Sequence, residues 1–325
     1  MKSESVDISI LMSVYNGEEF IEDAVNSVIQ QTLKSWELLI VDDCSTDHTL
    51  DIIKQFDDDR IIIIKNDEQK GLTANLCKMK QLARGKYIAR LDADDLCRSD
   101  RLEKQYNYLE QHSDVDLVCS YAEIIGDGKG LIKPPVDNED IKARLLFYSP
   151  IVHSSIMMRN SDLFYDESFK RSQDYDLWDR MVHSGRVFGT IPEPLVCFRY
   201  HKGQISNTGS ESQAYYANKV RSRALGRLGI DLSAEEAEAY YNFLNKNDVE
   251  DTEQFRLVFD VLSRIENSYS NQYCGKSLRK AIGSMDLALL KVANSRHFKI
   301  PFKLRLHLIS RAGIIRIIKD LIKRR

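Results

Sequence analysis

Three acidic side chains follow a short apolar run in the first third of the chain. Residues 87–91 read Tyr-Ile-Ala-Arg-Leu, which is typical of a buried strand, and Asp92, Asp94 and Asp95 come directly after it. Because side chains of a strand alternate between its two faces, we expect Asp92 and Asp94 to point the same way. Two such carboxylates repel each other unless a cation lies between them, and oxygen ligands suit Mg²⁺ or Mn²⁺. An Asp-rich turn that caps the next helix would fit the same residues.

A further carboxylate, Asp174, opens a helical pattern. Tyr175, Trp178 and Val182 repeat at helical spacing, so Asp174 is expected in the first turn of a helix. The helix dipole and the free backbone N–H groups of that turn stabilise an anionic carboxylate. A catalytic carboxylate and a simple helix cap are both consistent with this position.

Strands and helices alternate in the segments that must position these carboxylates. Apolar strands are predicted at residues 8–13, 36–41, 61–64, 87–91 and 116–119. Helices are predicted at residues 18–31 and 72–83, and two more are predicted to start after a cap at residues 45–47 and at an Asp100–Glu103 capping box. This order predicts a parallel sheet covered on both faces, with the four isoleucines of residues 61–64 buried on both sides. Ligands of such sheets bind where the strands end. Polar clusters fall at three of those ends, at residues 13–15, 42–43 and 92–95.

Composition restricts the class of protein. The 325 residues are enough for roughly two domains, and a net charge of −3 argues against a nucleic-acid-binding protein. The six cysteines have no Cys-x-x-Cys spacing, so we expect neither a zinc site nor a disulfide framework. Residues 1–7 are polar and lack the apolar core of a signal peptide, and no apolar run could span a membrane. We therefore expect a cytoplasmic protein.

The C-terminal part of the chain has a different character. Residues 211–294 keep helical spacing without an internal proline, which predicts a helical extension. From residue 299 onward Lys and Arg dominate, and Asp320 is the single acid among them. On a helix, Arg305, Arg316, Lys319 and Lys323 share one side, and an isoleucine-rich stripe falls mostly on the other. Such a basic amphipathic helix suits peripheral contact with the inner face of an anionic membrane, although an ordinary surface helix has the same pattern.

Three motifs together resemble the nucleotide-sugar-binding half of a family 2 glycosyltransferase. They are Ile-Leu-Met-Ser-Val-Tyr-Asn-Gly at residues 10–17, Val-Asp-Asp-Cys-Ser-Thr-Asp at 41–47 and Leu-Asp-Ala-Asp-Asp at 91–95. The resemblance covers about residues 7–205. It implies an α/β fold of the GT-A type, which is Rossmann-like with a mixed sheet flanked by helices. The domains would be residues 1–206, with a nucleotide-binding half to about 120 and an acceptor half from 121, and a helical region at 207–325.

The resemblance also implies roles for the residues that contact the nucleotide. Ser13 and Tyr15 would line the pocket, Asp43 would accept a hydrogen bond from the uracil N3–H while Asp42 supports its loop, and Asp92 would face the ribose.

A second set of residues would carry the chemistry. By the same resemblance, Asp94 would hold the Mn²⁺ or Mg²⁺ that bridges the two phosphates, with His201 as a further metal or pyrophosphate contact. Asp174 falls at the position of the general base. The family normally has a Glu-Asp pair there, and Gln173 replaces the Glu. His153 would lie near the acceptor.

The reaction implied is inverting, metal-dependent transfer of a sugar from a UDP-sugar to a hydroxyl of a glycan or lipid-linked glycan, in the synthesis of bacterial surface polysaccharide. Gln173 motivates one alternative, a catalytically impaired nucleotide-sugar-binding or scaffold protein. A second alternative is a phosphotransferase with Asp92 as nucleophile. A Rossmann dehydrogenase would need a Gly-x-Gly-x-x-Gly motif after the first strand, and only Gly17 is present there.

Overall fold

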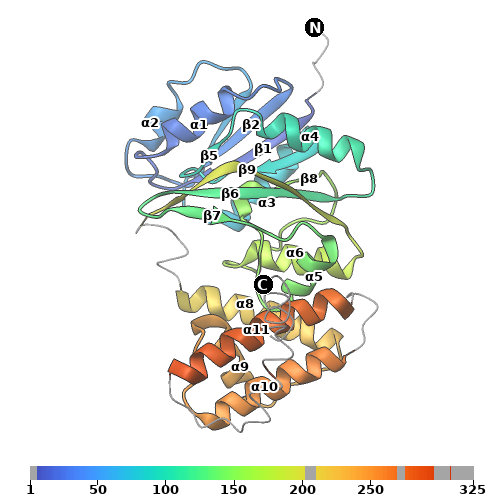
Figure 1. Cartoon of the computed structure of the whole chain (residues 1–325). Helices are drawn as coiled ribbons and strands as arrows, with labels where there is room; N and C mark the ends of the chain where they lie inside the picture. Colours follow the sequence, from blue (N-terminus) through green and yellow to red (C-terminus); the bar gives the residue numbers. More distant parts are fainter. Residues whose placement is uncertain (1–5, 202–209, 269–274, 296–307, 309–325) are drawn as a thin grey trace, which may run out of the picture. The chain divides into compact units, whose positions relative to one another are not determined.

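The computed structural model describes residues 6–201, 210–268, 275–295 and 308, and the chain divides into two compact units (Figure 1). Unit 1 comprises residues 1–141 and 149–216, and unit 2 comprises residues 142–148 and 217–325. The domain boundary predicted after residue 206 lies outside the described residues. The predicted basic helix from residue 299 also lies outside them, apart from residue 308.

Unit 1 is built around one mixed sheet of nine strands, counted over the residues that the structure describes. The strands are β1 Ile8–Val14, β2 Trp36–Asp42, β3 Ile61–Lys65, β4 Tyr87–Arg90, β5 Leu96–Cys97, β6 Leu117–Gly126, β7 Gly130–Ile132, β8 Met157–Arg159 and β9 Phe188–Tyr200. Their order is β3-β2-β1-β4-β8-β6-β9-β5, with β7 paired to β6. The first four strands are parallel, and β8 pairs antiparallel with both β4 and β6.

Helices cover this sheet from two sides. The helices of unit 1 are α1 Ile21–Ile29, α2 Thr49–Ile53, α3 Leu72–Leu82, α4 Arg101–Gln111 and α6 Gln173–His183, with the short 3₁₀ helix η1 at His153–Ser155. The helix α5 Asn138–Arg144 begins in unit 1 and ends in unit 2. In Figure 1, α1, α2 and α4 lie above the sheet, and α3 lies beneath it. The alternation of β1 explains this arrangement. Ile8, Ile10 and Met12 are buried in one core with the apolar faces of α1 and α4, whereas Ser13 points the other way and accepts a hydrogen bond from Asn75 of α3.

Two local predictions were wrong. The isoleucines of residues 61–64 are only half-buried, because β3 is the edge strand of the sheet and pairs only with β2 among the described strands. The Asp100–Glu103 capping box does not form. Asp100 caps no backbone N–H of α4 with its side chain, since it pairs with Lys104 at 2.7 Å, and Glu103 accepts a hydrogen bond from Thr32.

The longest of the described strands, β9, ends close to the carboxylates that follow β4. Pro192 and Pro194 lie in its middle, where the register with β6 shifts at Ser120 and Tyr121. A proline has no N–H to donate, so it is tolerated in a strand where pairing is interrupted. The strand then continues to Tyr200, and His201 directly after it contacts Asp94 in the turn that follows β4.

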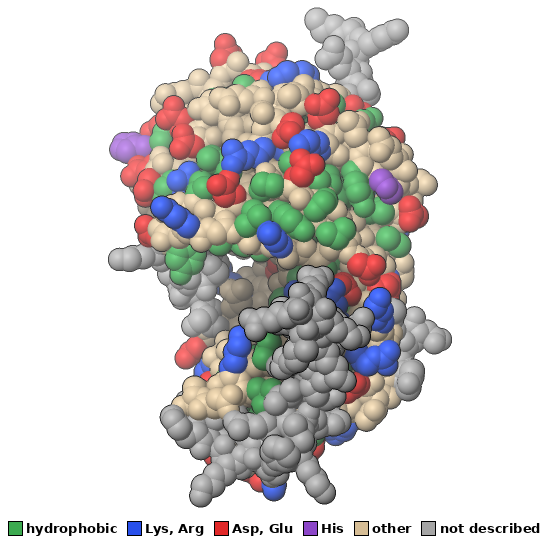
Figure 2. Space-filling view, viewed as in Figure 1, with side chains coloured by type: hydrophobic (Ala, Val, Ile, Leu, Met, Phe, Trp, Pro, Cys, Tyr) green, Lys and Arg blue, Asp and Glu red, His purple; other side chains and the backbone are tan. Residues whose placement is uncertain are grey.

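A broad apolar surface accompanies β6 and β7. Figure 2 shows hydrophobic side chains gathered on the face of unit 1 over these strands. Leu131 of β7 is 42% exposed, and Val136 in the following loop is 54% exposed.

Unit 2 is helical, as predicted. Its helices are α8 Ser210–Arg227, which begins in unit 1, α9 Ala234–Lys246, α10 Thr252–Asn267 and α11 Gly275–Ser295. Their shared core is mainly aliphatic, and it also contains Phe147, Tyr240, Phe243 and Phe255, which are almost fully buried. Among the described residues, no helix combines the length and apolar character needed to cross a membrane.

Candidate active site

Two loops at the carboxyl ends of β1 and β2 are joined by hydrogen bonds. The N–H of Asn16 donates to Ser45 Oγ at 3.0 Å, and Asn16 Oδ1 accepts from the N–H of Thr46 at 2.8 Å. Asn16 has a φ of 50°, a left-handed conformation that Asn tolerates better than most residues. The loop is therefore fixed, and it holds Tyr15 with 47% of its surface exposed. An exposed aromatic ring on a fixed loop can stack against a planar base.

Asp43 organises the neighbouring loop. Its Oδ1 accepts hydrogen bonds from Asn66 Nδ2 and from the N–H of Lys70, and its Oδ2 accepts one from the N–H of Gly71, all at 2.8 Å. Burial raises the pKa of Asp43, but these donors outweigh it and hold the pKa below its ordinary value. Asp43 is thus an anion at the floor of the loop formed by residues 66–71.

A chain of amide side chains connects Asp43 to Ser13. Asn66 Nδ2 donates to Asn75 Oδ1 at 2.7 Å, and Asn75 Nδ2 donates to Ser13 Oγ at 2.9 Å. Lys78 Nζ donates to Asn66 Oδ1 at 2.8 Å. Both asparagines are almost fully buried. Nothing in the sequence indicates this role, because Asn66 and Asn75 belong to no recognised motif and their pairing depends on the packing of α3 against β1.

Asp42, immediately before Asp43, is fully buried. Both of its carboxylate oxygens lack a hydrogen-bond partner among the residues that the structure describes. Its backbone carbonyl accepts from the N–H of Asn66 at 2.9 Å, and this contact connects β2 to the loop.

Asp92 is held from two sides. Arg90 Nη2 donates to its Oδ1, and Ser154 Oγ donates to its Oδ2 at 2.8 Å. Burial raises the pKa of Asp92, but the charge of Arg90 and these hydrogen bonds hold it below its ordinary value. Because β4 ends at Arg90, strand alternation does not extend to Asp92 and Asp94. The expectation that it would was wrong, and the two carboxylates have different partners.

Asp94 pairs with His201. His201 Nε2 lies 3.0 Å from Asp94 Oδ2, and the Asp94 backbone carbonyl accepts from Arg199 Nε at 2.8 Å. Burial and the neighbouring charge of Asp92 raise the pKa of Asp94, although the hydrogen bond from His201 lowers it. His201 thus supports this carboxylate, and Arg199 supports the backbone of the same residue.

Asp95 has a structural position. It is fully buried, and its Oδ1 accepts a hydrogen bond from the N–H of Arg199 at 2.8 Å. Burial and the charges of Asp92 and Asp94 raise its pKa well above the ordinary value. Asp95 therefore joins the acidic turn of residues 92–95 to β9 and does not reach the surface.

Asp174 lies in the first turn of α6, as predicted. Burial raises its pKa to about 6, with a further contribution from the charge of Asp92, while the backbone N–H groups of the helix start oppose the rise. A carboxylate with a pKa near neutrality can take up a proton at physiological pH.

A neutral pair accompanies these charges. His153 Nε2 lies 2.7 Å from the Tyr165 hydroxyl. Burial, reinforced by the charge of Arg90, lowers the pKa of His153 to about 3, so its imidazole is uncharged at neutral pH. Burial raises the pKa of Tyr165, with contributions from Asp174 and Asp92. The family resemblance predicts His153 near the acceptor, but nothing in the sequence predicts Tyr165 as its partner.

The residues fit a divalent cation only in part. Among the described residues, no cluster of three or more His, Cys, Asp or Glu side chains could hold a metal. Asp94 and His201 supply one oxygen and one nitrogen within hydrogen-bond distance of each other. Mg²⁺ and Mn²⁺ sites that bind diphosphates leave several positions to phosphate oxygens and water, so a two-ligand protein site is compatible with them.

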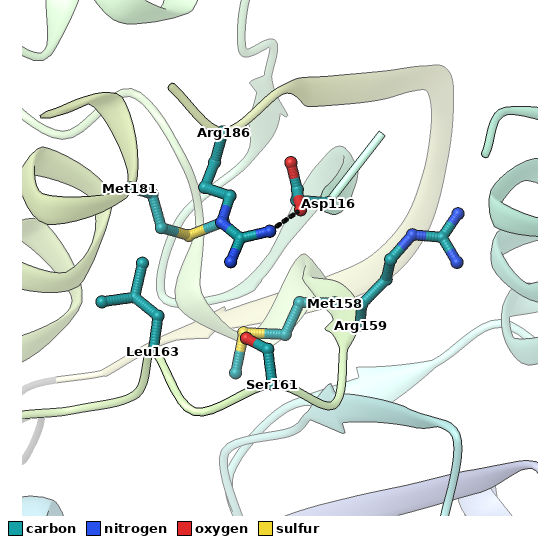
Figure 3. A pocket seen from close by; sticks show the side chains of 7 residues that line it. All are labelled: Asp116, Met158, Arg159, Ser161, Leu163, Met181 and Arg186. Carbon is teal, nitrogen blue, oxygen red and sulfur yellow. Dashed lines mark hydrogen bonds and ion pairs between the residues drawn. The ribbon is translucent and has the colours of Figure 1, made fainter. Parts of the chain in front are cut away.

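A small cavity lies elsewhere in unit 1 (Figure 3). Its lining residues are Asp116, Met158, Arg159, Ser161, Leu163, Met181 and Arg186, and Asp116 and Arg186 form an ion pair of 2.8 Å across it. Its volume of about 10 Å³ suits a single water. Arg159 pairs with Tyr87, the first residue of β4, whereas the carboxylates follow the last. The cavity is therefore at the opposite edge of the sheet from the carboxylates.

Comparisons with known proteins agree with this geometry. A family model described as Glycosyl transferase family 2 matches residues 9–166. A glycosyltransferase of Haemophilus influenzae is 31% identical over 247 residues, which cover 69% of this chain and 76% of that protein. WfaP of Escherichia coli, a UDP-Glc:alpha-D-GlcNAc-diphosphoundecaprenol beta-1,3-glucosyltransferase, is 30% identical over 222 residues, which cover 66% of this chain and 86% of WfaP.

A solved structure supports the same fold. The crystal structure of S. aureus TarS 1-349 in complex with UDP-GlcNAc matches with a TM-score of 0.60 at 17% identity, over 89% of each chain. At that identity the match establishes the arrangement of the elements and not the ligand.

Proposed function

The chain belongs to glycosyltransferase family 2, and on this premise we propose that it transfers a sugar from a UDP-sugar to an acceptor hydroxyl with inversion at the anomeric carbon. The GT-A fold and the transferase class predicted from the sequence are confirmed by the family and structure matches. The observation that carries the proposal is the polar cluster at the carboxyl ends of β2 and β4, in which Asp43, Asp92 and Asp94 are each held by hydrogen bonds.

Donor binding involves the loops at the ends of β1, β2 and β4. Tyr15 stacks on the base, Asp43 accepts from the uracil N3–H, and Ser13 lines the pocket. Asp92 faces the ribose. The exposure of Tyr15 and the fixed orientation of the Asp43 carboxylate support these roles.

Asp94 and His201 would hold a divalent cation beside the diphosphate. When bound, the cation supplies positive charge that stabilises the leaving group. Their 3.0 Å contact supports a shared ligand role. The buried Asp95 is outside this role, since its Oδ1 is engaged by the backbone of Arg199.

Asp174 acts as the general base. It takes the proton of the acceptor hydroxyl as that oxygen forms a bond to the anomeric carbon. The bond from the anomeric carbon to the diphosphate oxygen breaks, and UDP departs with the bonding electron pair. One displacement inverts the anomeric configuration. A pKa of about 6 leaves Asp174 ionised at neutral pH and able to accept a proton.

Gln173 motivates the alternative of a catalytically impaired donor-binding protein. The side chain is buried beside Asp174 and carries no charge. A Glu there would add a like charge beside the base. Because the pKa of Asp174 is already raised by burial and by Asp92, the missing carboxylate does not remove the base.

The acceptor proposed is a glycan or a lipid-linked glycan of a bacterial surface polysaccharide. Support comes from the name of WfaP, which specifies a GlcNAc-diphosphoundecaprenol acceptor. The basic residues from position 299 suit contact with an anionic membrane surface. If so, deleting residues 299–325 should reduce partitioning onto vesicles that contain anionic phospholipid, and unchanged partitioning would rule this segment out as the contact.

Calorimetry with UDP followed by turnover assays tests the proposal. We expect UDP to bind more tightly with Mn²⁺ than with EDTA, and a UDP-sugar with a GlcNAc-diphosphate-lipid acceptor to give a product of inverted anomeric configuration by NMR. Binding of GDP in place of UDP would overturn the donor assignment. Donor binding without turnover of any acceptor would favour the impaired protein, and a phosphorylated Asp92 would favour the phosphotransferase.

A further inference from the structure

We propose that Ser154 and Arg90 are positioning residues that fix the Asp92 carboxylate for the ribose of the donor. This inference rests on the proposed function, because it assigns two supporting residues to the same nucleotide site. Neither residue belongs to a recognised motif of the sequence.

The burial of the two charged groups differs sharply. The Arg90 side chain is 1% exposed, whereas that of Asp92 is 31% exposed. The guanidinium therefore lies behind the carboxylate, and the carboxylate forms part of the accessible surface. Arg90 is itself fixed, since its Nη1 donates to the carbonyl of Leu11 at 3.0 Å and to that of Leu91.

Ser154 holds the other side of Asp92. Its hydroxyl donates to Asp92 Oδ2 at 2.8 Å and accepts from the Asp92 N–H at 3.0 Å. Ser154 is fully buried in η1, 62 residues away in the chain, so it connects the acidic turn to a separate part of the sheet. A single hydroxyl thus fixes both the backbone and the side chain of Asp92.

These contacts leave Asp92 with capacity for a ligand. A carboxylate has about four acceptor positions. Arg90 and Ser154 occupy one on each oxygen, so the remaining positions are available on the exposed side. Two fixed contacts also set the plane of the carboxylate, and a hydroxyl pair of ribose would meet it without a reorientation cost.

Ser155 provides a matched control for Ser154. It is the next residue of the same 3₁₀ helix, is also fully buried, and its hydroxyl donates to the carbonyl of Val152 at 2.8 Å. Ser154→Ala and Ser155→Ala therefore each remove one buried hydroxyl from one short helix. Only the first removes a contact to Asp92, and comparable melting temperatures would show that folding is affected equally.

The test measures binding of UDP, 2′-deoxy-UDP and 3′-deoxy-UDP with Mn²⁺ to the full chain. We expect Ser154→Ala to weaken UDP binding by about 10-fold, as for loss of a hydrogen bond to a charged group. The preference of the wild type for UDP over the deoxy analogues should shrink in this variant. Ser155→Ala should retain both values, and Ser154→Cys, which keeps a weak donor, should recover part of the loss. In turnover assays, the donor KM of Ser154→Ala should rise, while its kcat should stay within about 2-fold of the wild-type value, as expected for lost uniform binding.

The outcomes separate the inference from the proposed function. No UDP binding by the wild type would overturn the proposed function and the inference together. Wild-type UDP binding that Ser154→Ala leaves unchanged, or that falls by one factor for all three ligands, would overturn the inference alone.

Discussion

His201 Nε2 lies 3.0 Å from Asp94 Oδ2, although 107 residues separate the two in the chain. The side chains of His201 and Asp94 are 24% and 28% exposed, so both reach the surface of unit 1. The adjacent Arg199 fixes the Asp94 backbone through its side chain and the buried Asp95 through its N–H. The end of β9 therefore orients the acidic turn in two ways, and His201 presents a nitrogen next to the carboxylate.

Removing either proposed metal ligand should reduce the metal dependence of nucleotide binding. We expect Asp94→Ala to abolish the gain in UDP affinity that Mn²⁺ gives, at a cost of at least about 10-fold, and His201→Gln to reduce the gain by less. Calorimetry with Mn²⁺ and with EDTA measures both. His112→Gln is the control, because His112 is an exposed histidine at the end of α4 whose Nδ1 contacts the Tyr108 carbonyl. A His201→Gln protein with wild-type metal dependence would exclude His201 as a ligand.

The base should be visible in both rate and pH dependence. Replacing Asp174 with Asn should lower kcat by about 10²–10⁴-fold, which is the usual contribution of a general base. UDP affinity should change little, because Asp174 is assigned to the acceptor side. In the wild type, kcat should fall as the pH drops through about 6, since protonated Asp174 cannot accept a proton. Full activity of Asp174→Asn, or a rate that is flat from pH 5 to 8, would contradict the assignment.

The same carboxylate should cost stability at neutral pH. The pKa of Asp174 rises from 3.8 to about 6 on folding, so between these values the unfolded chain has lost the proton that the native state still holds. Stability therefore falls as the pH rises through this window, and the penalty is complete above about pH 6. We expect Asp174→Asn to gain about 1–3 kcal/mol in the free energy of unfolding at pH 8. The gain should shrink toward pH 4, which urea unfolding at both pH values would reveal.

The sequence was sufficient for features that depend on local pattern. The burial of β1 and β2 follows from their apolar runs, and the position of Asp174 at a helix start follows from the spacing of Tyr175, Trp178 and Val182. Motif resemblance supplied Asp94 and His201 as a candidate pair. In each case the determining residues lie within a few positions of one another, or within a recognised motif.

Features that depend on strand order could not be predicted. Nothing local to residues 61–64 indicates that β3 is an edge strand, because that depends on which strands pair beyond it. The contacts of Asp92 with Ser154 and of Asp43 with Asn66 also join segments 62 and 23 residues apart. Arg90, an arginine within an apolar run, is the one local signal in the sequence that an acidic partner lies nearby.

A capping box in unit 2 should contribute measurably to stability. Ser233 Oγ accepts from the N–H of Glu236 at 3.1 Å, and the Glu236 carboxylate accepts from the N–H of Ser233 at 2.9 Å. Ser233→Ala should therefore lower the free energy of unfolding by about 1 kcal/mol, and Ser233→Gly by only a few tenths. Ser284→Ala is the control. Ser284 lies inside α11 with its hydroxyl bonded to the Lys280 carbonyl, where Ala is neutral or stabilising. Equal losses for the two Ala variants would contradict the capping role.

The amide chain below the nucleotide pocket should couple stability to binding. Asn66→Ala leaves Asp43, Asn75 and Lys78 each without one partner, and it should cost about 1–3 kcal/mol in the free energy of unfolding. UDP affinity should fall as well, because the carboxylate proposed to contact the base loses one of the donors that orient it.

Thr73→Val is the matched comparison for that variant. Thr73 is buried in α3 near Asn75, and its hydroxyl donates to the Phe169 carbonyl at 2.7 Å, outside the amide chain. The Thr73→Val protein should be less stable than the wild type, but calorimetry should show wild-type UDP affinity. If Asn66→Ala likewise lost stability but kept wild-type UDP affinity, Asp43 would be a loop anchor without a role in the base contact. The nucleotide would then have to be recognised mainly through Tyr15 and Asp92.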